Sequence, residues 1–204
     1  MQLGAGTQNL LRRLSPARLR FVHYSWPLRV ESCPCDVDFC DYLLERQIHR
    51  RAVFHMGSGG HHLVGRRNLG DGLCNEVLAL TLAPREHQDY VKLVVRDASL
   101  ARHYKVLFAD IYSLAPSSLG TYDLVSLFHL GEFSDEASGA RRLDDAGVLD
   151  LFVASLAPGG LLLFYRRSFG LPKVMPLVLR ACARRQIEFV EDFRSLAIYR
   201  RVAP

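Results

Sequence analysis

Residues 53–65 read VFHMGSGGHHLVG, an apolar run that ends in a glycine-rich turn and two adjacent histidines. Glycines allow backbone amides to approach a ligand closely, and the start of a following helix favours a carboxylate or a phosphate. The stretch is consistent with a turn that binds a nucleotide-like cofactor, with a metal site built from the histidines, or with the plain end of a buried strand. A glycine turn alone does not decide between these three structures.

Around this turn, segments with the pattern of strands alternate with segments that have the pattern of helices. Helices are expected at 37–51, from Pro84 to 95, from near Asp135 to Pro158, and at 171–186. Strands are expected at 51–56, 76–83, 104–110, 122–130, 160–167, 187–193 and 195–202, and the last two are joined too tightly for a helix to intervene. Near-continuous apolar strands alternating with helices predict a parallel sheet covered on both faces. We therefore predict an α/β, doubly wound, mostly parallel seven-stranded sheet with a terminal antiparallel hairpin.

This α/β domain is expected to span residues 36–204 and to follow a basic N-terminal extension at 1–35. The first 30 residues contain no Asp or Glu, and their arginines are Arg12, Arg13, Arg18, Arg20 and Arg29. A mitochondrial targeting sequence is the alternative for such a segment, although Pro16 and the scarcity of serine favour a basic arm in a cytoplasmic protein. Since no apolar run approaches the roughly 18–20 residues that span a bilayer, we expect no membrane-spanning helix.

Charge and cysteine content restrict the partners. The chain of 204 residues has a formal charge of +5, which permits contact with nucleic acid, but no nucleic-acid-binding motif supports it. The five cysteines are an odd number, and Cys33, Cys35 and Cys40 follow the spacing C-x-C-x4-C with no second pair. This spacing disfavours a zinc knuckle, and we expect free thiols in a reducing cytoplasm.

HMGSGGH within the glycine-rich stretch, together with ALTLAP, LFADIYSL and LAPGGLLLFY, follows the order of motifs of a known family. The chain resembles the class I S-adenosylmethionine-dependent methyltransferases over about residues 36–202. Gly57 and Gly59 match the family's glycine turn, and Asp110 matches the aspartate near the adenine amine. His55 and Thr81 stand where the family has acids. A dinucleotide fingerprint would instead require a glycine at His62.

The resemblance implies S-adenosylmethionine as cofactor and a methyl acceptor that is either a small molecule or a macromolecule. The implied cofactor-binding residues are His55, Gly57, Ser58, Gly59, Gly60, Thr81, Asp110 and Ile111. His129, at the end of the fourth expected strand, is the expected general base with a pKa near neutrality, and Glu132 is its expected companion. No resident metal is predicted.

The departures from the family pattern leave alternatives open. Each missing acid removes a charge-assisted hydrogen bond that contributes about 1.5–3 kcal/mol. Gly65, Gly70 and Gly72 also predict that the helix after the turn is short or broken. The alternatives are a catalytically inactive binding or scaffold protein that keeps the fold, or a metal-binding protein that uses the histidine cluster: His55, one of the adjacent pair, and either His129 or Asp110.

Overall fold

The computed structural model describes residues 22–133 and 143–203. Its strands are β1 (Ala52–Met56), β2 (Glu76–Thr81), β3 (Tyr104–Phe108), β4 (Tyr122–Ser126), β5 (Leu156–Tyr165), β6 (Ile187–Phe193) and β7 (Leu196–Arg201). Its helices are α2 (Cys35–Glu45), α3 (Leu63–Gly70), α4 (Pro84–Arg96), α5 (Leu100–His103), α6 (Asp145–Ser155) and α7 (Leu171–Ala183), with short 3-10 turns η1 (Ile111–Ser113) and η2 (Pro116–Ser118).

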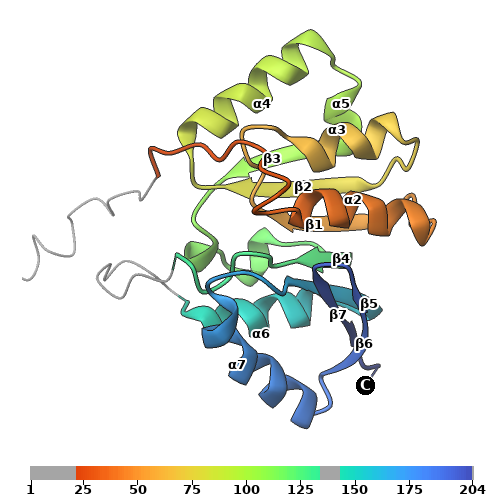
Figure 1. The fold of residues 1–204 in the computed structure, drawn as a ribbon, viewed down its shortest axis with the longest axis vertical. Coiled ribbons are helices and arrows are strands. Elements are labelled where there is room, and N and C mark those ends of the chain that lie inside the picture. Colours follow the sequence, from red (N-terminus) through yellow and green to blue (C-terminus); the bar gives the residue numbers. More distant parts are fainter. Residues whose placement is uncertain (1–21, 134–142, 204) are drawn as a thin grey trace, which may run out of the picture.

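The strands form one seven-stranded sheet in the order β3-β2-β1-β4-β5-β7-β6 (Figure 1). Pairings from β3 through β5 are parallel, and β7 runs antiparallel to both of its neighbours. The predicted fold class is therefore confirmed. The sheet order reverses between β1 and β4, and ligands of doubly wound sheets bind beside the carboxyl ends of the strands at such a reversal.

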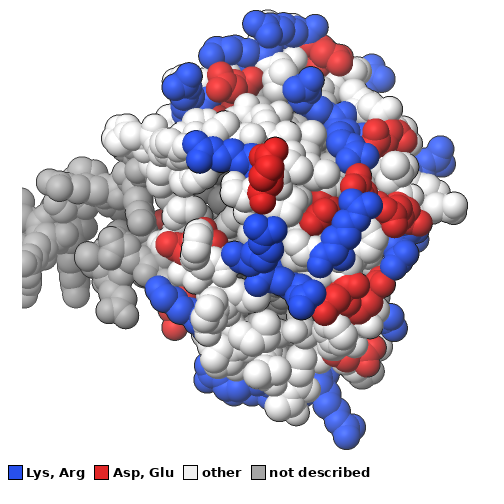
Figure 2. Space-filling view, viewed as in Figure 1, with Lys and Arg blue, Asp and Glu red and all other residues white. Residues whose placement is uncertain are grey.

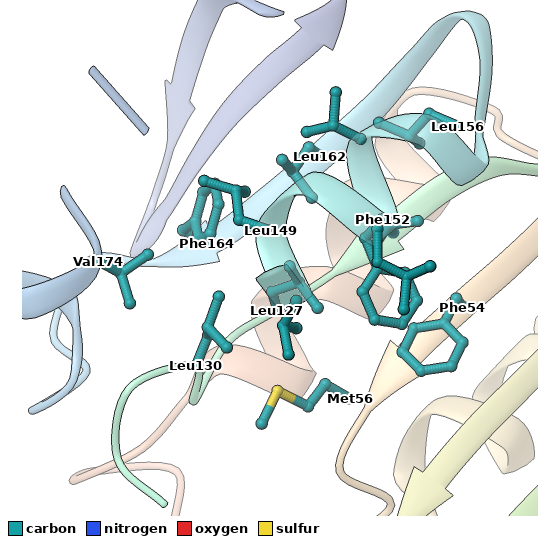
Figure 3. Packing of buried hydrophobic residues seen from close by; sticks show 14 of the residues in the cluster. Phe54, Met56, Leu127, Leu130, Leu149, Phe152, Leu156, Leu162, Phe164 and Val174 are labelled. Atoms are coloured by element: carbon teal, nitrogen blue, oxygen red, sulfur yellow. The ribbon is translucent and has the colours of Figure 1, made fainter. Parts of the chain in front are cut away.

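Helices cover both faces of the sheet because the central strands are buried on both sides. On one face α6 and α7 pack against β1, β4 and β5, and the rings of Phe54 and Phe152 lie 4.3 Å apart between their centroids (Figure 3). Leu162, Phe164 and Val174 continue this cluster. Burial of each such side chain contributes about 1.5–3 kcal/mol to folding.

On the opposite face α2, α3, α4 and α5 pack over β1, β2 and β3. Phe39 of α2 is fully buried and stacks on the ring of His55 at 5.8 Å. This packing fixes α2 so that its first turn, Cys35 and Asp36, reaches the carboxyl ends of the strands. The helix after the glycine turn, α3, has eight residues, which confirms the prediction of a short helix.

Several expected boundaries were wrong. Helix α2 ends at Glu45 and not at 51, and strand β4 ends at Ser126 and not at 130. The start expected near Asp135 lies outside the described residues, but residues 143 and 144 are described and are not helical. Helix α6 begins at Asp145, and the Asp144 carboxylate accepts a hydrogen bond from the Gly147 amide as its N-cap. Strand β5 begins at Leu156 and not near Gly160. The sequence Pro158-Gly159-Gly160 is accommodated inside β5 because the pairing with β4 shifts register there.

The described part of the N-terminal extension is residues 22–35, and its last residue, Cys35, already belongs to α2. The segment before α2 lies across the carboxyl ends of β1 and β2 (Figure 1). The Val22 amide donates to the Leu82 carbonyl, and the Gly60 amide donates to the Trp26 carbonyl, each at 2.9 Å. We call residues 22–29 the strap. Arg12, Arg13, Arg18 and Arg20, which characterise the basic extension, lie outside the described residues.

Candidate functional site at the carboxyl ends of the strands

A cavity of about 370 Å³ lies under the strap, at the carboxyl ends of β1 to β4. We call it the strand-end cavity. Seven of the sequence-predicted residues line it: Gly57, Gly59, Thr81, Asp110, Ile111, His129 and Glu132. The three others, His55, Ser58 and Gly60, are not among the residues that line it. The sequence therefore located the cavity, and the contacts within it show what each residue can do.

The glycine turn has the backbone freedom that its sequence suggested. Gly57 has φ +92°, and a Cβ atom added there would meet no atom within 4 Å. Gly59 has φ +55°, but a Cβ atom there would overlap the ring of His61. The space beside the turn is therefore open at Gly57, whereas at Gly59 it is filled by the side chain of this chain's own His61.

Behind the turn, His55 occupies the position of the family's first acid. Its Nδ1 atom lies 2.7 Å from Ser126 Oγ, and its buried Nε2 atom has no hydrogen-bond partner among the described residues. Burial lowers the pKa of His55 to about 3, so the ring is neutral. Asp36 of α2 faces it, with Oδ1 3.6 Å from His55 Nε2 and Oδ2 3.6 Å from His61 Nε2. A carboxyl group thus does stand at the end of β1, although it belongs to another element.

A second carboxyl group stands at the end of β2. Thr81 Oγ1 donates to Glu86 Oε2 at 2.6 Å, and the Trp26 amide of the strap donates to Glu86 Oε1 at 2.9 Å. Ser58 Oγ makes a longer contact of 3.4 Å with the same carboxylate. Burial raises the pKa of Glu86, and these hydrogen bonds oppose that rise. The Glu86 carboxylate, from the first turn of α4, therefore lies where Thr81 replaces the family's second acid.

Asp110 and Ile111 follow β3 at the next strand end. Asp110 is the N-cap of η1, and its Oδ1 atom accepts the Tyr112 amide at 3.1 Å. The neighbouring Ile111 is 4% exposed and presents apolar surface to the cavity. A carboxylate beside an apolar wall is suited to a flat heterocycle that carries an exocyclic amine.

The fourth strand end carries His129, whose Nδ1 atom lies 3.1 Å from Glu132 Oε1. The structure places Glu132, the expected companion, against the His129 ring, and the catalytic role of the pair stays a prediction. Ser168 Oγ and the Phe169 amide also donate to Glu132 Oε1, at 2.6 and 3.1 Å. Burial alone would lower the pKa of His129, but hydrogen bonds with Cys33 and Glu132 raise it to about 10. The expectation of a pKa near neutrality was wrong, because it did not include these anionic partners.

Two thiols complete this corner of the cavity. His129 Nε2 lies 3.8 Å from Cys35 Sγ and 4.0 Å from Cys33 Sγ. The hydrogen bond from Cys35 and the neighbouring His129 lower the pKa of Cys33 to about 4, whereas the Cys33 partner and burial raise the pKa of Cys35. These cysteines were predicted to be ordinary free thiols, and no sequence signal paired them with a histidine 94 residues further along the chain.

The adjacent histidines diverge, as their positions in a tight turn required. His61 faces Asp36 in the cavity, whereas His62 is fully buried between the Tyr104 hydroxyl and the Glu86 carbonyl, each at 3.0 Å. Because a carbonyl can only accept, His62 Nε2 carries the proton and Nδ1 accepts from Tyr104. The structure does not bring His55, His61 and His129 together as a metal site.

No protein-family model and no curated protein matches the sequence. Solved structures do match in fold. The N-methyltransferase NodS from Bradyrhizobium japonicum, in complex with S-adenosylhomocysteine, aligns over 95% of this chain and 97% of its own, with 17% identity and a TM-score of 0.59. The CcbJ methyltransferase from Streptomyces caelestis aligns over 87% of this chain and 94% of its own, with 12% identity and a TM-score of 0.61.

Another match, SpnF, is named a [4+2]-cyclase and not a methyltransferase. It aligns over 91% of this chain and 70% of its own, with 16% identity and a TM-score of 0.55. The chain therefore has the fold of S-adenosylmethionine-dependent methyltransferases. Since proteins with this fold differ in the reaction that they catalyse, the function has to be argued from the cavity.

Proposed function

We propose that this protein is an S-adenosylmethionine-dependent methyltransferase whose cofactor binds in the strand-end cavity. The observation that carries the proposal is the position of the cavity, at the reversal of sheet order and beside the open backbone of Gly57. Its volume of about 370 Å³ falls within the range of roughly 300–1,000 Å³ that is usual for small-molecule sites. The fold shared with NodS, which holds S-adenosylhomocysteine, supports the same ligand class.

The charge of the cavity favours a sulfonium over a dinucleotide. Among the described residues that line it, four carry carboxyl groups: Asp36, Glu86, Asp110 and Glu132. The basic residues of the lining are Arg29, His61 and His129, and the pKa of His129 is raised to about 10. Carboxylates would repel the pyrophosphate of a nicotinamide cofactor and would attract a cationic sulfonium and an ammonium group. Asp36 and Glu86 therefore supply carboxyl groups where the replacements at His55 and Thr81 removed acids. Burial raises the pKa of Asp36 to about 7 and raises that of Glu86, so a bound cation would favour the ionised form of both.

Each part of the cofactor has a counterpart in the cavity. We propose that the methionine part lies along Gly57 to Gly60, with its ammonium group toward Asp36. The ribose would lie near the Thr81–Glu86 pair, where one or both hydroxyls compete with the Trp26 amide for the carboxylate. The adenine would contact Ile111 and donate its amine to Asp110. When bound, the cofactor supplies an electrophilic methyl group.

The acceptor would approach from the corner of His129 and Glu132. Methyl transfer is an in-line displacement, and the protein contributes chiefly proximity and orientation. Glu132, held by Ser168 and the Phe169 amide, fixes the ring of His129. We propose that His129 and Glu132 orient the acceptor. Because the pKa of His129 is raised to about 10, the ring is charged at neutral pH and can take a proton from the acceptor only after it has released its own.

The acceptor class stays open between a small molecule and a macromolecule. On the face shown in Figure 2, Lys and Arg side chains are interspersed with Asp and Glu and do not form a basic stripe. Several are paired, as in Arg46–Glu191 and Arg67–Asp41 at 2.7 and 2.6 Å. Within residues 22–133 and 143–203, no helix combines the length and apolar character that crossing a bilayer requires. A cytoplasmic location stays a prediction.

Calorimetric titration of the full chain with S-adenosylmethionine, S-adenosylhomocysteine and NAD⁺ tests the proposal. We expect saturable binding of both adenosyl compounds with a stoichiometry of one per chain, and no binding of NAD⁺. Absence of adenosyl binding at millimolar ligand would refute the proposal and favour a scaffold that keeps the fold.

A further inference from the structure

Three potential metal ligands converge at one edge of the strand-end cavity. We propose that Cys33, Cys35 and His129 bind one zinc ion. The sulfur and nitrogen atoms concerned, Cys33 Sγ, Cys35 Sγ and His129 Nε2, all lie within 4.8 Å of one another. Zinc binding at this site does not depend on the proposed cofactor, because none of the three ligands is among the residues proposed to hold it.

The distances between these atoms fit tetrahedral coordination. With bonds of about 2.3 Å to sulfur and 2.05 Å to nitrogen, a tetrahedral zinc site places two sulfurs roughly 3.8 Å apart and a sulfur and a nitrogen roughly 3.6 Å apart. The structure has 3.4 Å between Cys33 Sγ and Cys35 Sγ, and 4.0 and 3.8 Å from these atoms to His129 Nε2. Shifts of less than about half an ångström would bring all three ligands to ideal zinc geometry.

The second interaction of His129 points to the same role. A carboxylate can only accept, so the contact with Glu132 keeps a proton on Nδ1, and Nε2 is the ring nitrogen that faces the thiols and would lose its proton to bind a metal. Metal-binding histidines usually donate their other ring nitrogen to a carboxylate in this way, which fixes the tautomer and strengthens the ligand. Ser168 and the Phe169 amide hold that carboxylate in turn.

The two thiols are held in place by the fold. Cys35 is the first residue of α2, whose unpaired amides favour an anionic ligand at that end. The Cys33 amide donates to the Arg29 carbonyl at 2.8 Å, and the Tyr165 hydroxyl donates to the Ser32 carbonyl at 3.2 Å. The site is therefore already arranged without a metal, and binding would require little ordering of the chain.

Thiolate and imidazole ligands select zinc over magnesium or calcium, which prefer oxygen. Three protein ligands leave a fourth position, and all three residues line the cavity, so this position faces the cavity interior. Catalytic zinc sites have this composition, whereas structural zinc sites have four protein ligands. If the proposed function is correct, the fourth position can receive the acceptor's heteroatom in place of water. A hydroxide on zinc would take up the acceptor's proton and leave as water, so that zinc would hold the deprotonated acceptor while the His129 lone pair is committed to the metal.

The test uses the untagged full chain, reduced and stripped of metal, without cofactor. Competition with a chromophoric chelator at pH 7 measures zinc stoichiometry and affinity, and Co²⁺ substitution gives an independent spectroscopic reading. We expect one zinc per chain, and a cobalt complex with sulfur-to-cobalt charge-transfer absorption and the intense visible bands of tetrahedral coordination.

Variants locate the site. Cys33→Ser, Cys35→Ser and His129→Ala should each weaken zinc binding at least 100-fold, and Glu132→Gln should weaken it about 10- to 100-fold, as losses of such carboxylates do. Cys182→Ser, a control thiol on α7, should leave affinity unchanged. The proposal is overturned if the reduced wild type binds no zinc or its cobalt complex lacks sulfur absorption. It is equally overturned if the Cys33→Ser/Cys35→Ser double variant retains wild-type affinity. If a variant does not fold, the wild-type cobalt spectrum still decides. Failure here leaves cofactor binding, measured separately, untouched.

Discussion

Replacing Thr81 by valine removes a hydroxyl group that makes two hydrogen bonds in a nearly dry environment. Thr81 Oγ1 donates to Glu86 Oε2 at 2.6 Å and accepts the Ala83 amide at 3.1 Å. Thr81, Ala83 and Glu86 are each 3% exposed or less. Valine keeps the shape and the strand preference of threonine, so the hydroxyl is the main difference.

The cost follows from these two hydrogen bonds. Loss of a hydrogen bond to a charged group costs about 1.5–3 kcal/mol, and a buried amide left without an acceptor costs about 1–3 kcal/mol. Because local relaxation recovers part of this sum, we expect Thr81→Val to lower the free energy of unfolding by about 3 kcal/mol. For a chain of this length that corresponds to a fall in Tm of about 6–12 °C.

Urea denaturation and thermal melts of the wild type, Thr81→Val and Thr81→Ser measure the effect. The serine variant retains the hydroxyl and loses one methyl group, which costs about 1 kcal/mol. The reasoning is refuted if the valine variant loses less than 1 kcal/mol, or if the serine variant loses as much as the valine variant. The first result would mean that the bond to Glu86 contributes little to the free energy of unfolding. The second would mean that the methyl group contributes as much as the hydroxyl group.

Three other outcomes are expected. Asp110→Ala should weaken S-adenosylhomocysteine binding by about 1–3 kcal/mol in calorimetry, and an unchanged Kd would exclude Asp110 as the adenine contact. Gly59→Val should reduce both cofactor binding and Tm, because valine there would overlap His61 and is strained at φ +55°, whereas an unchanged Tm would contradict this. His62 makes the free energy of unfolding depend on pH, because burial lowers the pKa of the folded His62 to about 4. The charges of His61 and Arg66 lower this pKa further, whereas Asp89 and the hydrogen bond to the Glu86 carbonyl raise it. The contribution is complete above the unfolded pKa of about 6.5 and is lost as pH falls, by about 2 kcal/mol between pH 7 and 5. His62→Asn should therefore flatten the loss of unfolding free energy over that range, and an unaltered slope would count against a neutral buried His62.

The strand ends of the cavity were accessible to sequence analysis because each motif is local. The apolar run before Gly57, the aspartate two residues after β3 and the histidine three residues after β4 identify three neighbouring positions once the sheet order is assumed. The His129–Glu132 contact spans three residues of one loop, so it too could be predicted.

The partners of these residues could not be predicted, because they come from elements that only the tertiary structure brings near. Asp36 and Cys35 belong to the first turn of α2, and their place beside His55 and His129 depends on how Phe39 packs against the sheet. Glu86 is five residues from Thr81, but no pattern in the sequence indicates that its side chain is buried against the strand end. For this reason the two replaced acids suggested a loss of function from the sequence alone.

The most direct test of the central claim is the position of S-adenosylhomocysteine in a crystal structure of its complex with this protein. We expect the ligand in the strand-end cavity, with its amino acid part along Gly57 to Gly60, its ribose near Glu86 and its adenine between Ile111 and Asp110. Its sulfur should face the corner that holds His129. A structure with the ligand bound outside this cavity, or with the cavity unchanged at saturating ligand, would contradict the account.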